Sequence, residues 1–341
     1  MINRQIRLQR RPTGAPTPDD FSIVDSPVPV LQDGHVLRRT IYLSLDPYMR
    51  GRMSDARSYA TPVALGDVMV GGTVSQVIES RDPKFAAGDF VAGMDGWQQY
   101  VSSPAAGLRK LDPNLAPIST AVGVLGMPGL TAYVGLLDIG QAKSGETVVV
   151  SAASGAVGSV VGQIARLKGC RAVGIAGTAE KCEYLTRELG FHAAVNHRDA
   201  DLRGALRAAC PDGIDVYFEN VGGVVLDAVM ALINRGARIP LCGLISQYNA
   251  SPLPPGPNLA PLLTNRARIQ GFIVLDHFDR FVAFLQECAP WVRNGQLRYR
   301  EDIVDGLDAA PNAFMGMLEG KNFGKLLVRV SPDPTRESGR V

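Results

Sequence analysis

The spacing of hydrophobic and polar positions changes near residue 120. Before it, short apolar and β-branched runs alternate with Pro and Gly, as in IRLQRR, FSIVDS, HVLRRTIYLSL and DVMVGGTVSQVIES. Short strands separated by turn residues are typical of a compact β-barrel-like domain. We therefore predict a β-rich domain over residues 1–119.

After residue 120, continuous apolar runs alternate with segments of helical period. ETVVVSA (146–152) has the unbroken apolar character of a buried parallel strand. In AVGSVVGQIARLKG, Val157, Val161 and Ile164 share one helical face, and Gly169 ends the helix. CRAVGIA, HAAVN, DVYFENV, ARIPLCGL and RIQGFIV continue the strands, with helices between them. This alternation predicts an α/β fold with a doubly wound parallel sheet over 120–299.

Composition narrows the class of protein. The 341 residues suit two domains, and a formal net charge of +2 leaves no basic surface for nucleic acid or an anionic membrane. Glycine is the outlier, with 37 residues against an average usage of roughly 7%. Part of it falls in β-domain turns. The rest collects at 126–129, 155–162, 174–177, 222–223 and 243, which predicts close approach of the main chain to a ligand.

Cysteine spacing and the N-terminus bear on the compartment. The five cysteines are widely spaced, the N-terminus is charged, and the apolar run 148–162 is interrupted by Gly and Ser. We expect a cytoplasmic protein without a disulfide framework, a secretory signal or a membrane span.

A glycine-rich turn, SAASGAVGS (151–159), stands where a predicted strand becomes a helix. Gly155 and Gly158 allow the main chain to approach a pyrophosphate at the helix N-terminus. The pattern A-x-x-G-x-x-G also fits a purely structural turn, but its strand–turn–helix context favours a dinucleotide site.

The residues after the second strand indicate which dinucleotide. NAD sites usually present an acid about 20 residues beyond the turn, whereas this chain has Gly177 and Thr178 there. Lys181 could pair with a 2′-phosphate, although a solvated helix lysine is the alternative. We therefore predict NADP.

The histidines do not form a metal site. None of the four pairs with another His or Cys at ligand spacing, and residues 1–119 contain no cysteine. A Cys–His zinc site is therefore not expected, and we predict a zinc-independent oxidoreductase with no metal ligands. His35 and His277 are interpreted as a turn residue and a helix-start residue.

Eight segments carry a family resemblance in order from residue 44 to 325: SLDPYMRGRM, GMPGLTAY, SAASGAVGSVVGQIA, GIAGTAEK, ENVGG, CGLISQYN, GFIV and NFGK. With them the chain resembles the zinc-independent medium-chain dehydrogenase/reductases, in the leukotriene B4 dehydrogenase/prostaglandin reductase branch that includes curcumin reductases. The resemblance implies a GroES-like β-barrel-type catalytic domain (1–119, completed by 300–330), a Rossmann-type NADP-binding domain (120–299) and a flexible tail (331–341). It also implies a homodimer.

The implied activity is NADPH-dependent reduction of the C=C bond of α,β-unsaturated ketones or aldehydes. The resemblance assigns the cofactor to these residues: Met127, Gly155, Ala156, Val157, Gly158, Gly177, Thr178, Lys181, His197, Asn220, Cys242, Gly243, Leu244, Ile245, Ser246, Phe272, Ile273, Val274 and Asn322. The family often has Tyr where His197 stands. His197 could still donate to phosphate, or it could be a surface loop residue.

Hydride addition to an enone leaves negative charge on the carbonyl oxygen, which a hydrogen-bond donor would stabilise. Tyr248 is the first candidate because it follows a strand end, and Tyr48 is the second. A cofactor ribose hydroxyl could share this role, and either tyrosine could instead be a half-buried apolar residue. The α-carbon proton is expected from solvent.

A quinone reductase and a non-catalytic NADPH-binding sensor are the alternative functions. The Pro-rich segment 249–263 is either a surface connection or a wall of the ligand site.

Overall fold

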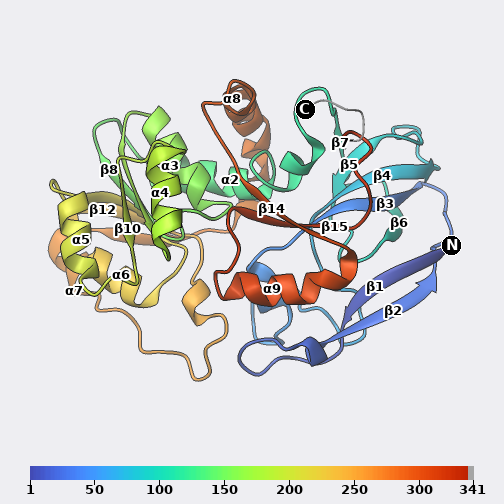
Figure 1. Ribbon diagram of the computed structural model, residues 1–341, viewed down its shortest axis with the longest axis horizontal. Coiled ribbons are helices and arrows are strands. Elements are labelled where there is room, and N and C mark those ends of the chain that lie inside the picture. Colours follow the sequence, from blue (N-terminus) through green and yellow to red (C-terminus); the bar gives the residue numbers. More distant parts are fainter. Residues whose placement is uncertain (337–341) are drawn as a thin grey trace. The chain divides into compact units, whose positions relative to one another are not determined.

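A computed structural model describes residues 1–336. The chain divides into two compact units (Figure 1). Within the described residues, the first contains Met1–Gly123, Glu301–Asn322 and 326–336, and the second contains Val124–Arg300 and Phe323–Lys325. Over residues 1–336, no helix combines the length and apolar character needed to cross a membrane.

The first unit is built on antiparallel strands. Within the described residues, a seven-stranded sheet has the order β14-β15-β3-β4-β5-β7, with β6 paired to β3, and β1 pairs separately with β2. The bounds are β1 Ile2–Leu8, β2 Phe21–Pro27, β3 His35–Ser44, β4 Thr73–Ser80, β5 Phe90–Gly93, β6 Tyr100–Pro104, β7 Arg109–Leu111, β14 Glu301–Asp305 and β15 Lys325–Arg329, with helices α1 Tyr48–Arg52 and α9 Ala310–Leu318.

The core of this unit contains an aromatic group and a buried ion pair. Trp97 stacks on Phe21 with ring centroids 5.6 Å apart, and Phe314 of α9 meets Trp97 edge-on at 5.7 Å. Arg38 and Asp95, both almost fully buried, form a bidentate pair with bonds of 2.6 and 3.2 Å. The predicted β-rich domain is confirmed.

The second unit has a parallel sheet of six strands in the part of the chain that is described. Its order, β10-β9-β8-β11-β12-β13, is that of a doubly wound fold and confirms the predicted α/β class. The strands are β8 Thr147–Val150, β9 Arg171–Ala176, β10 Ala193–Asn196, β11 Ile214–Phe218, β12 Ile233–Leu241 and β13 Arg268–Gly271. The helices are α2 Met127–Val134, α3 Gly158–Leu167, α4 Ala179–Arg187, α5 Leu202–Ala209, α6 Gly223–Met230, α7 Ala260–Asn265 and α8 Phe281–Arg293.

Short helical segments complete the chain: 3-10 turns at Pro18–Asp20, Ile118–Val122, Ile245–Gln247, Val274–Arg280 and Leu307–Ala309, and a π-helical turn at Gly135–Ile139. In the second unit, helices α3 and α4 pack against β8 to β10, while α7 packs against β12 (Figure 1). The apolar face of α3, fully buried at Val161 and Ile164, explains why the predicted helical period is correct here.

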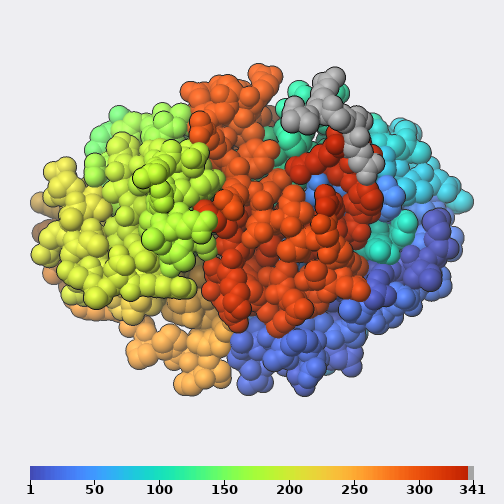
Figure 2. All heavy atoms as spheres, viewed as in Figure 1, coloured from blue at the N-terminus to red at the C-terminus, as the bar shows by residue number. Residues whose placement is uncertain are grey.

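Two local predictions differ from the structure. The Pro-rich loop ends at Leu259, because α7 begins at Ala260; residues 251–256 are exposed, and the loop is seen at the lower edge of Figure 2. The polar tail is anchored at its start rather than frayed. Tyr42 Oη donates to the buried Asp333 at 2.9 Å, and Ser331 Oγ donates to the Thr40 carbonyl at 2.6 Å. The remainder of that tail, 337–341, lies outside the described residues.

Candidate functional site

The glycine-rich turn joins β8 to α3 at the carboxyl edge of the parallel sheet. Ala152 adopts a positive φ of 49°, and a Cβ on Gly158 would lie 2.5 Å from the Ala152 carbonyl oxygen. Gly158 is therefore required for close packing within the turn, whereas at Gly155 the nearest atom to such a Cβ is 3.2 Å away. Helix α3 begins after Val157 with no side-chain cap. An uncapped helix N-terminus behind a glycine turn fits a pyrophosphate.

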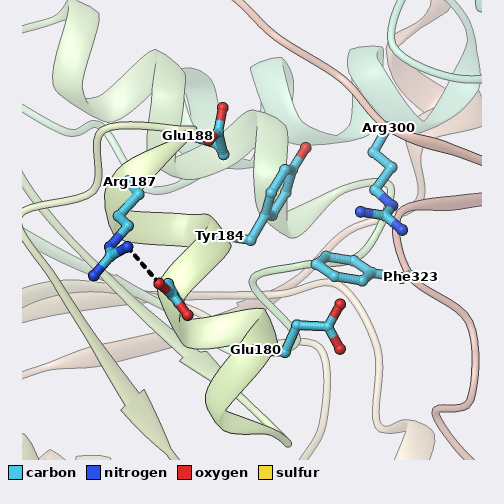
Figure 3. A pocket seen from close by; sticks show the side chains of 7 residues that line it. Glu180, Tyr184, Arg187, Glu188, Arg300 and Phe323 are labelled. Carbon is cyan, nitrogen blue, oxygen red and sulfur yellow. Dashed lines mark ion pairs between the residues drawn. The ribbon is translucent and has the colours of Figure 1, made fainter.

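Gly324 lies against this turn. The Gly324 amide donates to the Ser154 carbonyl at 3.1 Å, and Gly324 pairs with Gly155 as a parallel bridge. The predicted Asn322 is two residues before Gly324 in the sequence. The Arg300 guanidinium carbon lies 4.0 Å from the centroid of the Phe323 ring. The Tyr184 ring packs edge-on against Phe323, with the ring centroids 4.9 Å apart (Figure 3).

These two aromatic rings line a hollow of about 270 Å³ beside α4 (Figure 3). It is lined by Glu180, Glu183, Tyr184, Arg187, Glu188, Arg300 and Phe323, none of which is a predicted cofactor residue. Arg187 is already paired with Glu183 at 2.7 Å. The hollow is therefore a charged surface feature next to the phosphate turn rather than the predicted site.

The end of β9 holds a group of cationic side chains around Gly177. Thr178 caps α4, because its hydroxyl accepts from the Lys181 amide at 3.2 Å. His197 Nε2 would lie 3.0 Å, and Arg198 Nε 3.8 Å, from a Cβ on Gly177. Burial, followed by Arg198 and Lys181, lowers the pKa of His197. The sequence analysis missed Arg198, although it directly follows His197.

The loops after β11 and β12 lie side by side. The main-chain amides of Cys242 and Gly243 donate to the Glu219 carbonyl at 2.9 and 3.2 Å. The Ile245 amide donates to the Asn220 carbonyl at 3.1 Å. Burial raises the pKa of the Cys242 thiol to about 12, which leaves it as a thiol at neutral pH. The structure therefore brings Asn220 together with the predicted segment Cys242–Ser246.

Tyr248 stands at the end of this segment. Its hydroxyl accepts from the Leu244 amide at 3.4 Å and would lie 2.9 Å from a Cβ on Gly243. A hydroxyl that accepts a hydrogen bond is polarised toward donation. Tyr48 lies in the other unit, at the first residue of α1, where burial raises its pKa.

The remaining predicted residues lie around α2. Phe272 meets Phe218 edge-on at 6.2 Å, and a Cβ on Gly135 would lie within 2.6 Å of both rings. Ile273 and Val274 follow Phe272, with Val274 buried, and Met127 is the first residue of α2. Among residues 1–336, no group of three or more His, Cys, Asp or Glu side chains is placed to hold a metal ion.

Comparison with known proteins shows which family has this architecture. Residues 4–111 match the model of the N-terminal domain of oxidoreductase, and residues 156–289 match the model named zinc-binding dehydrogenase. The chain is 54% identical to an NADPH-dependent curcumin reductase of Escherichia coli, over 97% of this chain and 98% of that protein. The chain belongs to the zinc-independent medium-chain dehydrogenase/reductases.

Other members of this reductase branch match over almost the whole chain. A 2-alkenal reductase (NADP(+)-dependent) of Nicotiana tabacum is 43% identical, over 96% of this chain and 98% of that protein. The crystal structure of CurA in complex with NADPH from Vibrio vulnificus is 53% identical, with a TM-score of 0.93, covering 97% of this chain and all of that one. A quinone oxidoreductase of Pseudomonas syringae shares only the fold, at 19% identity and a TM-score of 0.76.

Proposed function

We propose that the protein is an NADPH-dependent reductase of the C=C bond in α,β-unsaturated ketones and aldehydes. The observation that carries the proposal is the pair of cationic side chains, Lys181 and Arg198, that lies with His197 at the end of β9, where an NAD-dependent enzyme has an acid. The relatives named curcumin reductase and 2-alkenal reductase support the substrate class.

The residues present fit NADPH. The turn from Gly155 to Gly158 and the N-terminus of α3 would hold the pyrophosphate, while Lys181, His197 and Arg198 would hold the 2′-phosphate. The segments at Asn220, at 242–246 and at 272–274 would line the nicotinamide side. When bound, NADPH supplies the hydride that the β-carbon of the substrate accepts.

The chain's own contribution to the chemistry is a hydrogen bond at the substrate carbonyl. Tyr248 would donate a hydrogen bond to that oxygen, where negative charge builds as the β-carbon is reduced. We assign the proton that the α-carbon receives to solvent.

A screen of NADPH oxidation with alkenones, alkenals, curcumin-like dienones and quinones tests the proposal. We expect turnover with the conjugated carbonyl compounds. Tyr248→Phe should lower enone turnover about 10- to 1000-fold and leave quinone reduction largely intact, because quinones do not require a positioned enolate donor. Equal losses would overturn the assignment of Tyr248. Turnover of quinones alone would favour a quinone reductase, and NADPH binding without any turnover would favour a sensor.

The proposal includes a homodimer in the cytoplasm. The edge strand β13 is exposed throughout, and large apolar side chains lie exposed near it in sequence, at Leu263, Leu275, Phe278 and Val282. An uncovered edge strand with apolar neighbours supports pairing with a second copy. All five cysteines are free, which suits a reducing compartment. Light scattering of the purified protein tests the dimer.

A further inference from the structure

A fully buried carboxyl group stands where the nicotinamide-side segments meet. Glu219 follows the last residue of β11 and has no exposed surface. Burial raises its pKa, against the effect of nearby donors. Removing a carboxyl group from water costs several kcal/mol unless its oxygens are hydrogen-bonded.

One carboxyl oxygen organises the chain between β11 and α6. Glu219 Oε1 accepts from the Val221 amide at 2.6 Å and from Ser151 Oγ at 2.9 Å. The Gly222 amide also faces the carboxyl group. In the described part of the chain, Oε2 has no hydrogen-bond partner. The titratable groups that face Glu219 are the buried Tyr217 and Cys242.

The serine that contacts Glu219 in turn fixes Asn220. Ser151 Oγ accepts from the Asn220 amide, and Asn220 Nδ2 donates to the Ser151 carbonyl, both at 2.8 Å. The Glu219 main chain also accepts from the amides of Cys242 and Gly243. Glu219 and its neighbours therefore connect the carboxyl ends of three adjacent strands, β8, β11 and β12.

We infer that Glu219 is a positioning residue for the nicotinamide half of the cofactor site, acting through Ser151 and the Val221 turn to orient Asn220 and the 242–246 segment. The inference rests on the proposed function. The carboxyl group contacts the glycine-rich turn only at its first residue, Ser151. Its hydrogen bonds involve neither Gly155 to Gly158 nor the group formed by Lys181, His197 and Arg198. Its loss should therefore affect one half of the cofactor and spare the other.

Binding measurements on the full chain separate the two halves. In Glu219→Leu we expect the NADPH dissociation constant to rise about tenfold, because the Val221 amide loses its side-chain acceptor and the Ser151 hydroxyl keeps only the longer contact to the Phe218 carbonyl, at 3.4 Å. The dissociation constant of adenosine 2′,5′-bisphosphate, which probes only the phosphate half, should stay within about twofold. Glu219→Gln should restore NADPH binding, since an amide oxygen can accept both bonds and its nitrogen takes the place of the unpartnered oxygen.

Two further variants keep the test decisive. Ser151→Ala removes the hydroxyl that joins Glu219 to the Asn220 amide and leaves the bond from Asn220 Nδ2 to the main chain of residue 151 in place. It should raise the NADPH constant about 2- to 12-fold, which provides the test if Glu219→Leu does not fold. Glu301→Leu is the matched control, because Glu301 is a buried acid in the other unit that also accepts from a serine, Ser119, at 3.0 Å. It should leave both constants unchanged in the folded fraction.

Equal weakening of both probes, identical behaviour of the Leu and Gln variants, or unchanged NADPH binding in Glu219→Leu and Ser151→Ala would overturn the inference. These constants do not depend on turnover. Failure of every substrate to be reduced would therefore overturn the proposed function while the assignment of Glu219 is still decided by binding.

Discussion

Lys181 is expected to decide the preference for NADPH over NADH. It is the third residue of α4, whose first turn carries the positive end of the helix dipole. A cation there costs about 0.3–1 kcal/mol unless an anion accompanies it. The centroid of the Phe323 ring lies 5.9 Å from Lys181 Nζ. This cation–π contact stabilises the lysine by about 0.5 kcal/mol at a partly exposed position. The two terms nearly cancel, so Lys181→Ala should shift the thermal midpoint by no more than about 2 °C.

The effect on binding should be far larger. A charge-assisted hydrogen bond contributes about 1.5–3 kcal/mol, so the NADPH dissociation constant should rise about 10- to 150-fold in Lys181→Ala. Arg198 and His197 lie beside Lys181 and share the phosphate, which favours the lower part of that range. NADH lacks the 2′-phosphate, and its dissociation constant should not change.

Titration of tryptophan fluorescence with each nucleotide measures both constants. Lys110→Ala is a suitable control, because this lysine pairs with Asp89 at 2.6 Å in the other unit. Lys181→Arg should recover much of the affinity. If Lys181→Ala weakens NADH and NADPH equally, then Lys181 does not contact the 2′-phosphate and the reasoning is wrong.

Two further predictions concern His197 and the buried ion pair. The pKa of His197 is lowered, so its imidazole is neutral at pH 8; a bound phosphate would offset Arg198 and Lys181 and raise that pKa. The affinity for NADPH relative to NADH should therefore rise as the pH falls from about 8 to about 6.5, and a flat ratio, or an unchanged slope in His197→Gln, would contradict this assignment. Arg38→Met leaves the buried Asp95 without its cation and should lower the free energy of unfolding by about 3–5 kcal/mol, measured by denaturant titration. The NADPH affinity of the folded fraction should not change, and a loss below about 1 kcal/mol would show that Asp95 is compensated in another way.

The sequence was sufficient where one period or one local motif carries the information. The apolar run 146–152 corresponds to β8, and Thr178 caps α4 as its residue type suggests. The parallel sheet follows from the repetition of such units. These features depend on residues close together in the chain, so single-sequence reasoning can find them.

Features made by distant segments were not predictable in this way. Glu219 resembles any strand-end acid until Ser151, 68 residues earlier, is seen against it. Asp333 belongs to a polar tail by composition, yet Tyr42 holds it from 291 residues away. Arg198 directly follows the predicted His197 in the sequence. Only the folded structure, which places Arg198 beside Gly177 and Lys181, shows that its charge could help to bind the 2′-phosphate.

The glycine excess shows how far composition can be interpreted. Among the described residues, 17 glycines have positive φ and serve turns. At Gly162 a Cβ would lie 2.0 Å from the Phe191 ring, and at Gly129 it would lie 1.9 Å from the Val124 carbonyl oxygen, so both are needed for packing inside the unit. Both belong to the glycine clusters that we predicted to lie close to the ligand, at 126–129 and 155–162. The expectation that every glycine in such clusters marks close approach of the main chain to NADPH is therefore too broad. It holds best for Gly155, where the one neighbour found for a Cβ is the Ala152 carbonyl oxygen at 3.2 Å. It also holds for Gly177 and Gly243, whose nearest neighbours are the side chains of His197 and Tyr248 that we assign to the site.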